Sequence, residues 1–180
     1  MKREELRFSG SGGQGVILAT VIMAEAAVIA GKYTAQSQSY GPEARGGSCK
    51  AECIISDEPI HFTKVTHPTF LLALTQNALE KYAKELPREA TVLIDDSLTS
   101  PACLENNRVV ALPILKTAKE VVGKAFTANI VAVGAVNELL HVVSDEEIRN
   151  AVRLHIPAGT EEINMRALEE GIRLSKNIKK

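Results

Sequence analysis

Glycine spacing near the start of the chain provides the clearest candidate for ligand chemistry. In "RFSGSGGQGV", residues 7–16, three glycines stand at the G-x-G-x-x-G spacing, directly before a long apolar stretch. Such glycines allow a tight strand-to-helix turn and let a phosphate approach the backbone, where the N–H groups of the next helix bind it. The candidate cofactor-binding positions are therefore Gly10, Ser11, Gly12, Gly13, Gln14 and Gly15.

A complete dinucleotide site needs a second feature that this sequence lacks. In dinucleotide-binding folds, an Asp or Glu about 20 residues after the glycines binds a ribose hydroxyl group. The corresponding stretch here is "KYTAQSQSYGP", residues 32–42, and no carboxylate follows until Glu43. Three interpretations of the glycines stay open: a dinucleotide, another phosphate or carboxylate, and close packing of a tight turn.

A second glycine-rich loop strengthens the case for a ligand or partner. The stretch "SQSYGPEARGGS", residues 37–48, carries Glu43 and Arg45 beside Gly46 and Gly47. An arginine with open backbone around it can present its guanidinium group to a carboxylate or phosphate. An exposed turn with an ordinary Glu and Arg is the alternative, and it would be the better interpretation if this loop stood alone.

Cysteine, histidine and aspartate residues give weaker signals. Three cysteines are too few and wrongly spaced for a disulfide framework or zinc site, so we expect buried free thiols, with Cys49 and Cys53 on one strand face. The four histidines show no metal-ligand spacing. Asp95 and Asp96 follow a core strand, but without an acid-base partner they are better explained as turn or cap residues. We assign no catalytic residue and no metal site.

Strand-like and helix-like segments alternate along the chain. A hairpin is also expected from Cys53 through the turn at 57–59 and back through 60–62, which would add an antiparallel pair. Ser144 and Glu147 match a capping box, and Thr160 is expected to cap the last helix. Hydrophobic periodicity predicts strands at 6–9, 33–39, 48–56, 70–74, 92–94 and 109–112, and helices at 15–30, 77–85, 114–122 and 129–141.

This alternation predicts an α/β fold: a Rossmann-like, three-layer α/β/α sandwich with a mostly parallel or mixed sheet. The 180 residues contain no repeat or linker, so we expect a single domain over 1–180.

Lys and Arg number 21 against 22 Asp and Glu, so nothing in the charge calls for nucleic acid or a membrane surface. The longest apolar stretch, 16–30, is shorter than the roughly 20 residues of a membrane span, and we expect a cytoplasmic protein.

Three motifs in this order carry a resemblance to a known family. The stretches "SGSGGQGV", "SQSYGPEARGGS" and "VLIDDSL" resemble the gamma subunit, or gamma domain, of the 2-oxoacid:ferredoxin oxidoreductases. The resemblance extends from Leu6 to about Gly171. It implies a complex that decarboxylates a 2-oxo acid on thiamine diphosphate, passes electrons through iron-sulfur clusters to ferredoxin, and forms an acyl-CoA. The isolated gamma chain would be inactive.

The resemblance also implies a division of labour among subunits. Three cysteines cannot ligate a cluster in the usual way, and no Gly-Asp-Gly precedes Asn106 and Asn107, so both cofactors are expected on alpha and beta subunits, with a delta or ferredoxin-like subunit as a further partner. Coenzyme A is expected at Gly10 to Gly15. Positions facing the catalytic partner would be Ser37, Tyr40, Gly41, Glu43, Arg45, Gly46 and Gly47.

The stretch "SYGPEARGG" resembles 2-oxoglutarate-type gamma subunits more than pyruvate-type ones, and this resemblance implies 2-oxoglutarate as substrate, with pyruvate or a branched 2-oxo acid next. Two alternatives from other classes stay open. A self-contained NAD(P)-binding oxidoreductase would bind the dinucleotide as an isolated chain. A purely structural subunit would use both loops only to fill an interface. An isolated gamma chain exposes surface that its partners normally cover, so a homodimer of the chain alone is compatible with all of these interpretations.

Overall fold

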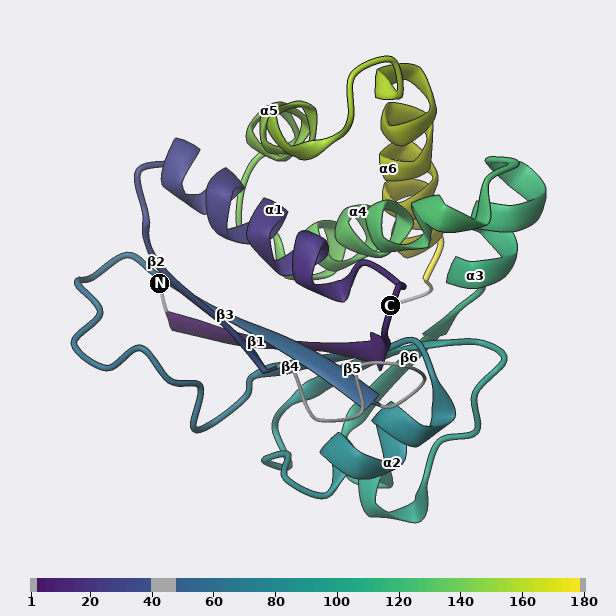
Figure 1. Cartoon of the computed structure of the whole chain (residues 1–180). Helices are drawn as coiled ribbons and strands as arrows, with labels where there is room; N and C mark the ends of the chain where they lie inside the picture. The colour runs from purple at the N-terminus through teal and green to yellow at the C-terminus, as the bar shows by residue number, and fades with distance from the viewer. Residues whose placement is uncertain (1–2, 40–47, 179–180) are drawn as a thin grey trace.

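The computed structural model describes residues 3–39 and 48–178. A six-stranded sheet in the order β2-β3-β1-β4-β5-β6 forms its centre (Figure 1). Strands β1, β4, β5 and β6 are parallel neighbours, whereas β3 is antiparallel to both β1 and β2, so the predicted mixed sheet is confirmed. The strands are β1 (Arg3–Ser11), β2 (Tyr33–Ser39), β3 (Ser48–Ser56), β4 (Phe70–Ala73), β5 (Thr91–Asp95) and β6 (Arg108–Leu112).

Helices cover both faces of the sheet, which confirms the predicted three layers. Helices α1 (Val16–Ile29) and α4 (Ala128–Leu140) lie on one face, with α5 (Asp145–His155) against α1 and α6 (Glu161–Lys176) against α4. Helix α2 (Gln76–Ala83) covers the opposite face (Figure 1). Shorter helical segments are η1 (Ala102–Leu104), α3 (Ile114–Lys116), η2 (Thr117–Val121) and η3 (Ala125–Thr127).

Strand β4 shows how the residue pattern builds two cores. Phe70 and Leu72 face the larger core beneath α1 and α4, and Leu71 and Ala73 face the smaller core beneath α2. A strand that is buried on both faces is apolar throughout, which explains the short apolar run. Helices α1 and α4 are apolar nearly all round because each lies between the sheet and an outer helix. None of the described helices is long and apolar enough to span a membrane.

The predicted hairpin through residues 60–62 is wrong. Residues 57–69 contain no strand, and the antiparallel pairing comes instead from β3, which lies between β1 and β2. The chain returns to the sheet after this segment as β4, which is parallel to β1 on its other side. The turn at 57–59 therefore begins a long connection rather than a hairpin.

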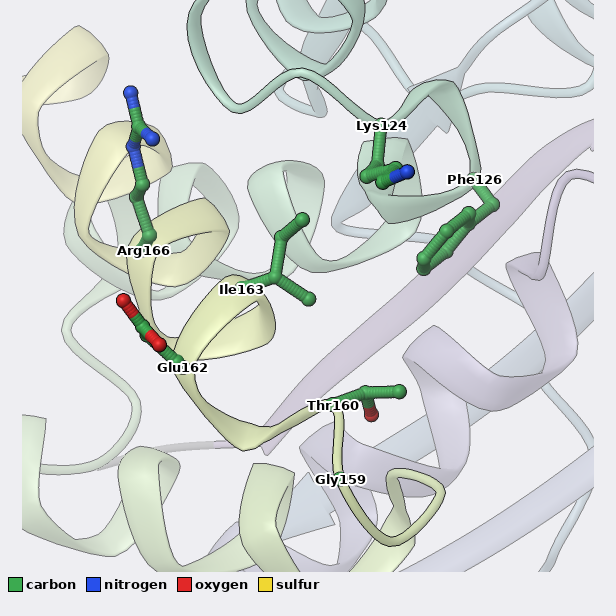
Figure 2. A pocket seen from close by; sticks show the side chains of 7 residues that line it. All are labelled: Lys124, Phe126, Gly159, Thr160, Glu162, Ile163 and Arg166. Carbon is green, nitrogen blue, oxygen red and sulfur yellow. The ribbon is translucent and has the colours of Figure 1, made fainter.

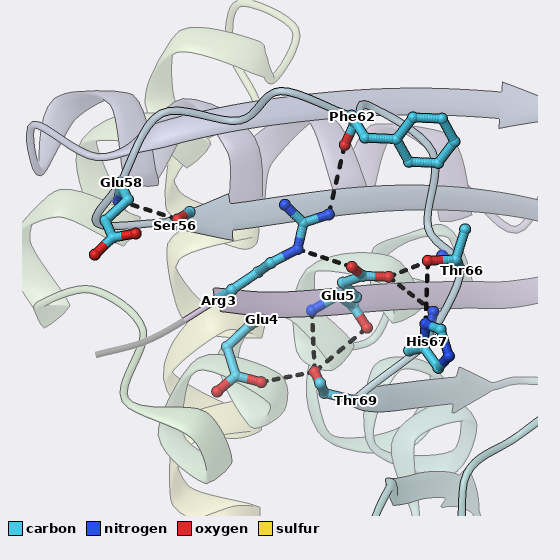
Figure 3. Close-up of polar contacts among 9 residues, drawn as sticks. All are labelled: Arg3, Glu4, Glu5, Ser56, Glu58, Phe62, Thr66, His67 and Thr69. Atoms are coloured by element: carbon cyan, nitrogen blue, oxygen red, sulfur yellow. Dashed lines mark hydrogen bonds and ion pairs between the residues drawn. The ribbon is translucent and has the colours of Figure 1, made fainter.

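Glu5 on β1 holds the end of this long connection. Its carboxylate accepts hydrogen bonds from the backbone N–H groups of Thr66 (2.8 Å) and His67 (3.0 Å) and from Nε of Arg3 (2.8 Å; Figure 3). The Thr69 hydroxyl accepts from the Glu5 N–H and donates to Glu4. Burial alone would raise the pKa of Glu5, but these hydrogen bonds outweigh it and lower the pKa below its ordinary value.

Glu5→Gln is expected to destabilise the fold in a pH-dependent way. The two backbone N–H groups bind one carboxylate oxygen and Nε of Arg3 binds the other, so the NH2 group of the amide would face one of these donors and the ion pair with Arg3 would be lost, at a cost of about 1.5–3 kcal/mol. Because the folded-state pKa is lowered, the carboxylate stabilises above its unfolded pKa, and this contribution is lost as pH falls through the folded pKa. Urea unfolding should show a gap between wild type and variant at pH 7 that narrows on acidification below about pH 4.5. Glu58→Gln, on the exposed start of the same segment, should show no such gap.

Two predicted helix caps have different outcomes. Ser144 forms a capping box, because its hydroxyl accepts from the Glu147 N–H and the Glu147 carboxylate accepts from the Ser144 N–H. Thr160 stands at the N-cap position of α6, but its hydroxyl donates to the Pro157 carbonyl and accepts from Asn164. The prediction of Thr160 as the N-cap residue of α6 is therefore correct, but its side chain accepts no capping hydrogen bond from the backbone of the helix.

Helices α4 and α6 approach so closely that only glycine fits where they cross. A Cβ atom on Gly134 would lie 2.2 Å from the backbone oxygen of Leu168, and one on Gly171 would lie 2.0 Å from that of Val131. Ser175 also donates to the Ala135 carbonyl oxygen at 3.0 Å. Helix α6 thus fixes α4 by backbone-to-backbone contact.

The cysteines agree only in part with the prediction of buried thiols. Cys53 lies in the larger core, where burial raises its pKa to about 12, and the half-buried Cys49 packs against the same core. Cys103 is exposed on η1, contrary to the prediction. Among the described residues, no group of His, Cys, Asp or Glu is arranged to hold a metal ion.

Candidate functional site

The glycine turn between β1 and α1 is closed by its own glutamine. The Gln14 N–H donates to the Ser11 carbonyl (3.2 Å), and the Ser11 N–H donates to Oε1 of Gln14 (2.7 Å). Gly12 and Gly13 are exposed at the tip of this turn. The turn is therefore held from within, and its backbone is open to solvent where a ligand would approach.

The N-terminus of α1 carries no side-chain cap. Gly15 occupies the N-cap position without a side-chain hydrogen bond, and the first turn of α1 contains no acidic residue. The first hydrogen bond of the helix runs from the Ala19 N–H to the Gly15 carbonyl, so the N–H groups of residues 16–18 have no partner within the helix. Together with the helix dipole, these donors suit a phosphate or carboxylate group.

Helix α4 fixes the position of this turn through a contact with Gly15. Gly15 has a φ of 71°, which favours glycine, and a Cβ atom there would lie 2.5 Å from Nδ2 of Asn129. Asn129 is buried at the start of α4 and donates to the Gly15 carbonyl at 3.4 Å. These residues are 114 positions apart in the chain, so no local sequence pattern could have linked them.

The second candidate loop begins and ends beside the glycine turn. In the sheet register, Ser11 pairs with Ser48, and Ser39 pairs with Lys50. The two ends of the segment 40–47 therefore lie at the same edge of the sheet as the glycine turn. Ser37 lies on β2, two residues before the end of the strand; it is half-buried and pairs with Glu52 of β3. The following candidates lie outside the described residues: Tyr40, Gly41, Glu43, Arg45, Gly46 and Gly47.

Two parallel neighbouring strands lead into opposite faces at this end of the sheet. Strand β1 leads into α1 on one face of the sheet, and its parallel neighbour β4 leads into α2 on the other face. In α/β sheets, ligands bind outside the carboxyl ends of strands where such connections diverge. The N-termini of α1 and α2 therefore flank this end of the sheet on its two faces.

Gln76 fixes the start of α2 at this end of the sheet, and the sequence did not reveal this role. Its amide donates to the Thr99 carbonyl (3.1 Å), and its Oε1 accepts from the Thr99 N–H (3.0 Å). This pair of hydrogen bonds ties the loop after β4 to the loop after β5. An isolated Gln at a helix start carries no sequence signal for such a role.

The sheet order also weighs against a dinucleotide. In the dinucleotide-binding fold, the strand that carries the ribose carboxylate is a direct neighbour of the strand before the glycines. Here β3 separates β2 from β1, so the end of β2 lies two strand spacings, roughly 9.6 Å, from β1. The missing carboxylate and the inserted strand both disfavour a dinucleotide site.

Asp95 has a structural role, as the sequence favoured. One carboxylate oxygen accepts from the backbone N–H and hydroxyl of Ser97, and the other accepts from the Leu115 N–H at 2.7 Å. Its carboxylate therefore closes the turn after β5 and caps α3. The exposed Asp96 bonds through its backbone N–H to Leu112.

A buried arginine supports β1 from the α2 side. Nε of Arg7 lies 2.7 Å from Glu52, and its Nη1 lies 2.8 Å from Glu85. The guanidinium group also lies over the Tyr82 ring, 5.8 Å from the centroid. These contacts leave Arg7 committed to the sheet rather than to a ligand.

A shallow pocket of about 440 Å³ lies elsewhere, between η3 and the start of α6 (Figure 2). The side chains of Glu162 and Arg166 point away from its centre (Figure 2), and Arg166 donates to the Val121 carbonyl. None of the candidate residues that the structure describes lines this pocket. Its lining residues are Lys124, Phe126, Gly159, Thr160, Glu162, Ile163 and Arg166.

Comparison with known proteins places this geometry in a family. The 2-oxoglutarate synthase subunit KorC of Methanocaldococcus jannaschii is 42% identical over 179 residues, which cover 98% of this chain and 96% of the relative. The keto/oxoacid ferredoxin oxidoreductase gamma subunit of Geobacter sulfurreducens matches with a TM-score of 0.90 and 46% identity over all of both chains. The 2-oxoglutarate:ferredoxin oxidoreductase of Magnetococcus marinus matches all of this chain and 32% of its own, with a TM-score of 0.90; at 22% identity this match shows the fold alone.

A family model described as pyruvate ferredoxin/flavodoxin oxidoreductase matches residues 5–174. The chain belongs to this family. Within it, the chain is a gamma subunit of a 2-oxoacid:ferredoxin oxidoreductase, an enzyme of several subunits. The resemblance inferred from the three sequence motifs is therefore confirmed, as is the assignment to an oxidoreductase.

Proposed function

We propose that this gamma subunit serves an oxidoreductase that converts 2-oxoglutarate, coenzyme A and oxidised ferredoxin into succinyl-CoA, CO2 and reduced ferredoxin. The observation that carries the substrate is the 42% identity to a 2-oxoglutarate synthase subunit over nearly the whole chain. The Magnetococcus enzyme, which shares the fold, has 2-oxoglutarate, coenzyme A and succinyl-CoA bound. Pyruvate or a branched 2-oxo acid is the next candidate.

The share of the gamma subunit is to bind the phosphates of coenzyme A at the glycine turn. The uncapped N-terminus of α1 supports this role, because it offers unpaired N–H groups without a neighbouring carboxylate. The pyrophosphate would lie against the exposed backbone of Gly12 and Gly13. Asn129 behind Gly15 would keep the turn in place before coenzyme A arrives, so little ordering would accompany binding.

The segment from Ser37 to Ser48 would face the catalytic subunits. Its two ends lie beside the glycine turn, so a partner that contacts this segment would also stand next to the bound coenzyme A. The 2-oxo acid would react on thiamine diphosphate held by the alpha and beta subunits, and iron-sulfur clusters on partner subunits would pass the electrons to ferredoxin. The gamma subunit would present the thiol of coenzyme A to that reaction.

Purification of the tagged chain from its native host under anaerobic conditions tests this proposal. Co-purified alpha and beta subunits, with viologen reduction that requires both 2-oxoglutarate and coenzyme A, are the expected result. Strong preference for pyruvate or a branched 2-oxo acid would overturn the substrate. Recovery of the chain alone, with binding of NAD or NADP, would favour the self-contained dinucleotide enzyme instead.

A further inference from the structure

The pocket between η3 and the start of α6 has two apolar walls. The side chains of Phe126 and Ile163 lie on opposite sides of its centre, and Lys124 lies on a third side (Figure 2). Phe126 is 64% exposed although it is a large apolar residue. An open aromatic ring beside a cavity of about 440 Å³ can stack against a planar ring of a small ligand.

Lys124 is the cation of this pocket that is available to a ligand. The guanidinium group of Arg166 points away from the centre and donates to the Val121 carbonyl oxygen. The ammonium group of Lys124 has no hydrogen bond or ion pair within the part of the chain that the structure describes. Its backbone is fixed, because its N–H donates to Ala118 and its carbonyl oxygen accepts from Thr127. A free ammonium group on a fixed backbone suits a phosphate.

The segment that carries Lys124 and Phe126 follows an irregular helical turn. In η2, the Val122 N–H donates to the carbonyl oxygen of Thr117, five residues earlier, which defines a π turn. Single π turns are uncommon and recur at functional sites. Arg166 holds the end of this turn, so α6 fixes the wall of the pocket that bears both side chains.

The pocket is separate from the glycine turn but close to it. Phe126 precedes Asn129 by three residues, and Asn129 donates to the Gly15 carbonyl oxygen at 3.4 Å. Residues three apart lie on the same face of a helical segment, about 5 Å apart along its axis. Phe126 and Asn129 therefore face the same side, and a ligand at the glycine turn would have the pocket beside it.

We infer that this pocket receives the adenosine end of coenzyme A, with the base between Phe126 and Ile163 and the ribose phosphate against Lys124. This inference rests on the proposed binding of the pyrophosphate at the glycine turn. In coenzyme A, a ribose joins the base to the pyrophosphate, so the molecule would extend from that turn past Asn129 into the pocket. The carboxylate of Glu162 points away from the centre, so it leaves the phosphate position open (Figure 2).

Lys124→Gln in the assembled oxidoreductase tests the phosphate contact. The KM for coenzyme A should rise about fivefold or more, because a charge-assisted hydrogen bond is lost. The KM for dephospho-coenzyme A, which lacks the ribose phosphate, should stay unchanged. Viologen reduction with each thiol as the varied substrate measures both values. Lys119→Gln, exposed on η2 and outside the pocket lining, is the matched control and should change neither.

Phe126→Ala tests the base contact. The KM should rise about fivefold or more for coenzyme A and for dephospho-coenzyme A alike, because both carry the base and stacking on an aromatic ring is lost. The kcat should stay unchanged. Phe62→Ala, on an equally open aromatic residue of the connection 57–69, is the matched control and should alter neither KM.

Adenosine 3′,5′-bisphosphate, which has the base and both phosphates but no thiol, separates two sources of the same chemistry. It should inhibit the wild-type enzyme in competition with coenzyme A, and it should inhibit both variants more weakly. Inhibition that coenzyme A cannot relieve would mean that the pocket takes a free nucleotide, which would overturn the inference.

Co-purification of the other subunits shows that each variant assembles. Unaltered KM values in assembled Lys124→Gln and Phe126→Ala enzymes would overturn the inference, as would a Lys124→Gln effect of equal size on both thiols. Gly12→Val tests the glycine turn separately. A raised KM for coenzyme A in that variant alone would leave the proposed function standing without the adenosine pocket, whereas raised values in the two pocket variants alone would support the pocket and contradict the glycine turn.

Discussion

Gly12→Val is expected to raise the apparent KM for coenzyme A by about tenfold or more in the assembled oxidoreductase, with the KM for the 2-oxo acid unchanged. The valine side chain would occupy the exposed tip of the turn, where the pyrophosphate must approach the backbone. A loss of about 1.4 kcal/mol in binding corresponds to this tenfold change. Steady-state viologen reduction with coenzyme A as the varied substrate measures it.

A matched control separates this effect from a general disturbance. Ala158→Val adds similar bulk at an exposed position in the connection between α5 and α6, and it should leave both KM values unchanged. Co-purification of the other subunits shows whether the variant still assembles. An assembled Gly12→Val enzyme with an unaltered KM for coenzyme A would contradict coenzyme A binding at the glycine turn and favour a purely structural role for the turn.

Gly171→Ala should cause a large loss of stability, because its Cβ atom would have the shortest contact found at any of the described glycines. The new Cβ atom would lie 2.0 Å from the Val131 carbonyl oxygen and 2.9 Å from the Ala135 nitrogen, so two helix backbones would have to separate. We expect a cost of about 3 kcal/mol, or roughly 10 °C in Tm, because overpacking against rigid backbone cannot be relieved by a rotamer change. Thermal and urea unfolding of the purified chain measure this loss.

A loss of stability in this variant would be informative, because helix propensity alone predicts that alanine stabilises the helix. Alanine is favoured over glycine in an exposed helix interior by about 1 kcal/mol. Glu169→Ala on the exposed face of α6 is the control and should change stability only slightly. A Gly171→Ala chain as stable as wild type would mean that α4 and α6 are farther apart than the structure shows.

The glycine turn could be predicted from sequence because its determinants are local. The spaced glycines, the strand before them and the apolar helix after them all lie within residues 3–30. The capping box at Ser144 was predictable for the same reason. These features depend on neighbours in the chain, which a single sequence displays directly.

The errors arose where tertiary contacts decide the structure. Residues 57–62 carry turn signals and an apolar segment, which resemble a hairpin, but β1 and β2 occupy the two sides of β3 and leave that segment no strand partner. Glu5, which lies 61 positions from Thr66, then fixes the end of the long connection that begins with this segment. The contact of Asn129 with Gly15 is likewise invisible in the sequence. Long-range pairing overrides local signals in each case.

The structure of the assembled oxidoreductase with coenzyme A, determined by electron cryomicroscopy, tests the central claim most directly. The account predicts the pyrophosphate within hydrogen-bond distance of backbone N–H groups at the glycine turn or the first turn of α1. Coenzyme A ordered with its phosphates entirely on another subunit, and the glycine turn packed against protein, would contradict it.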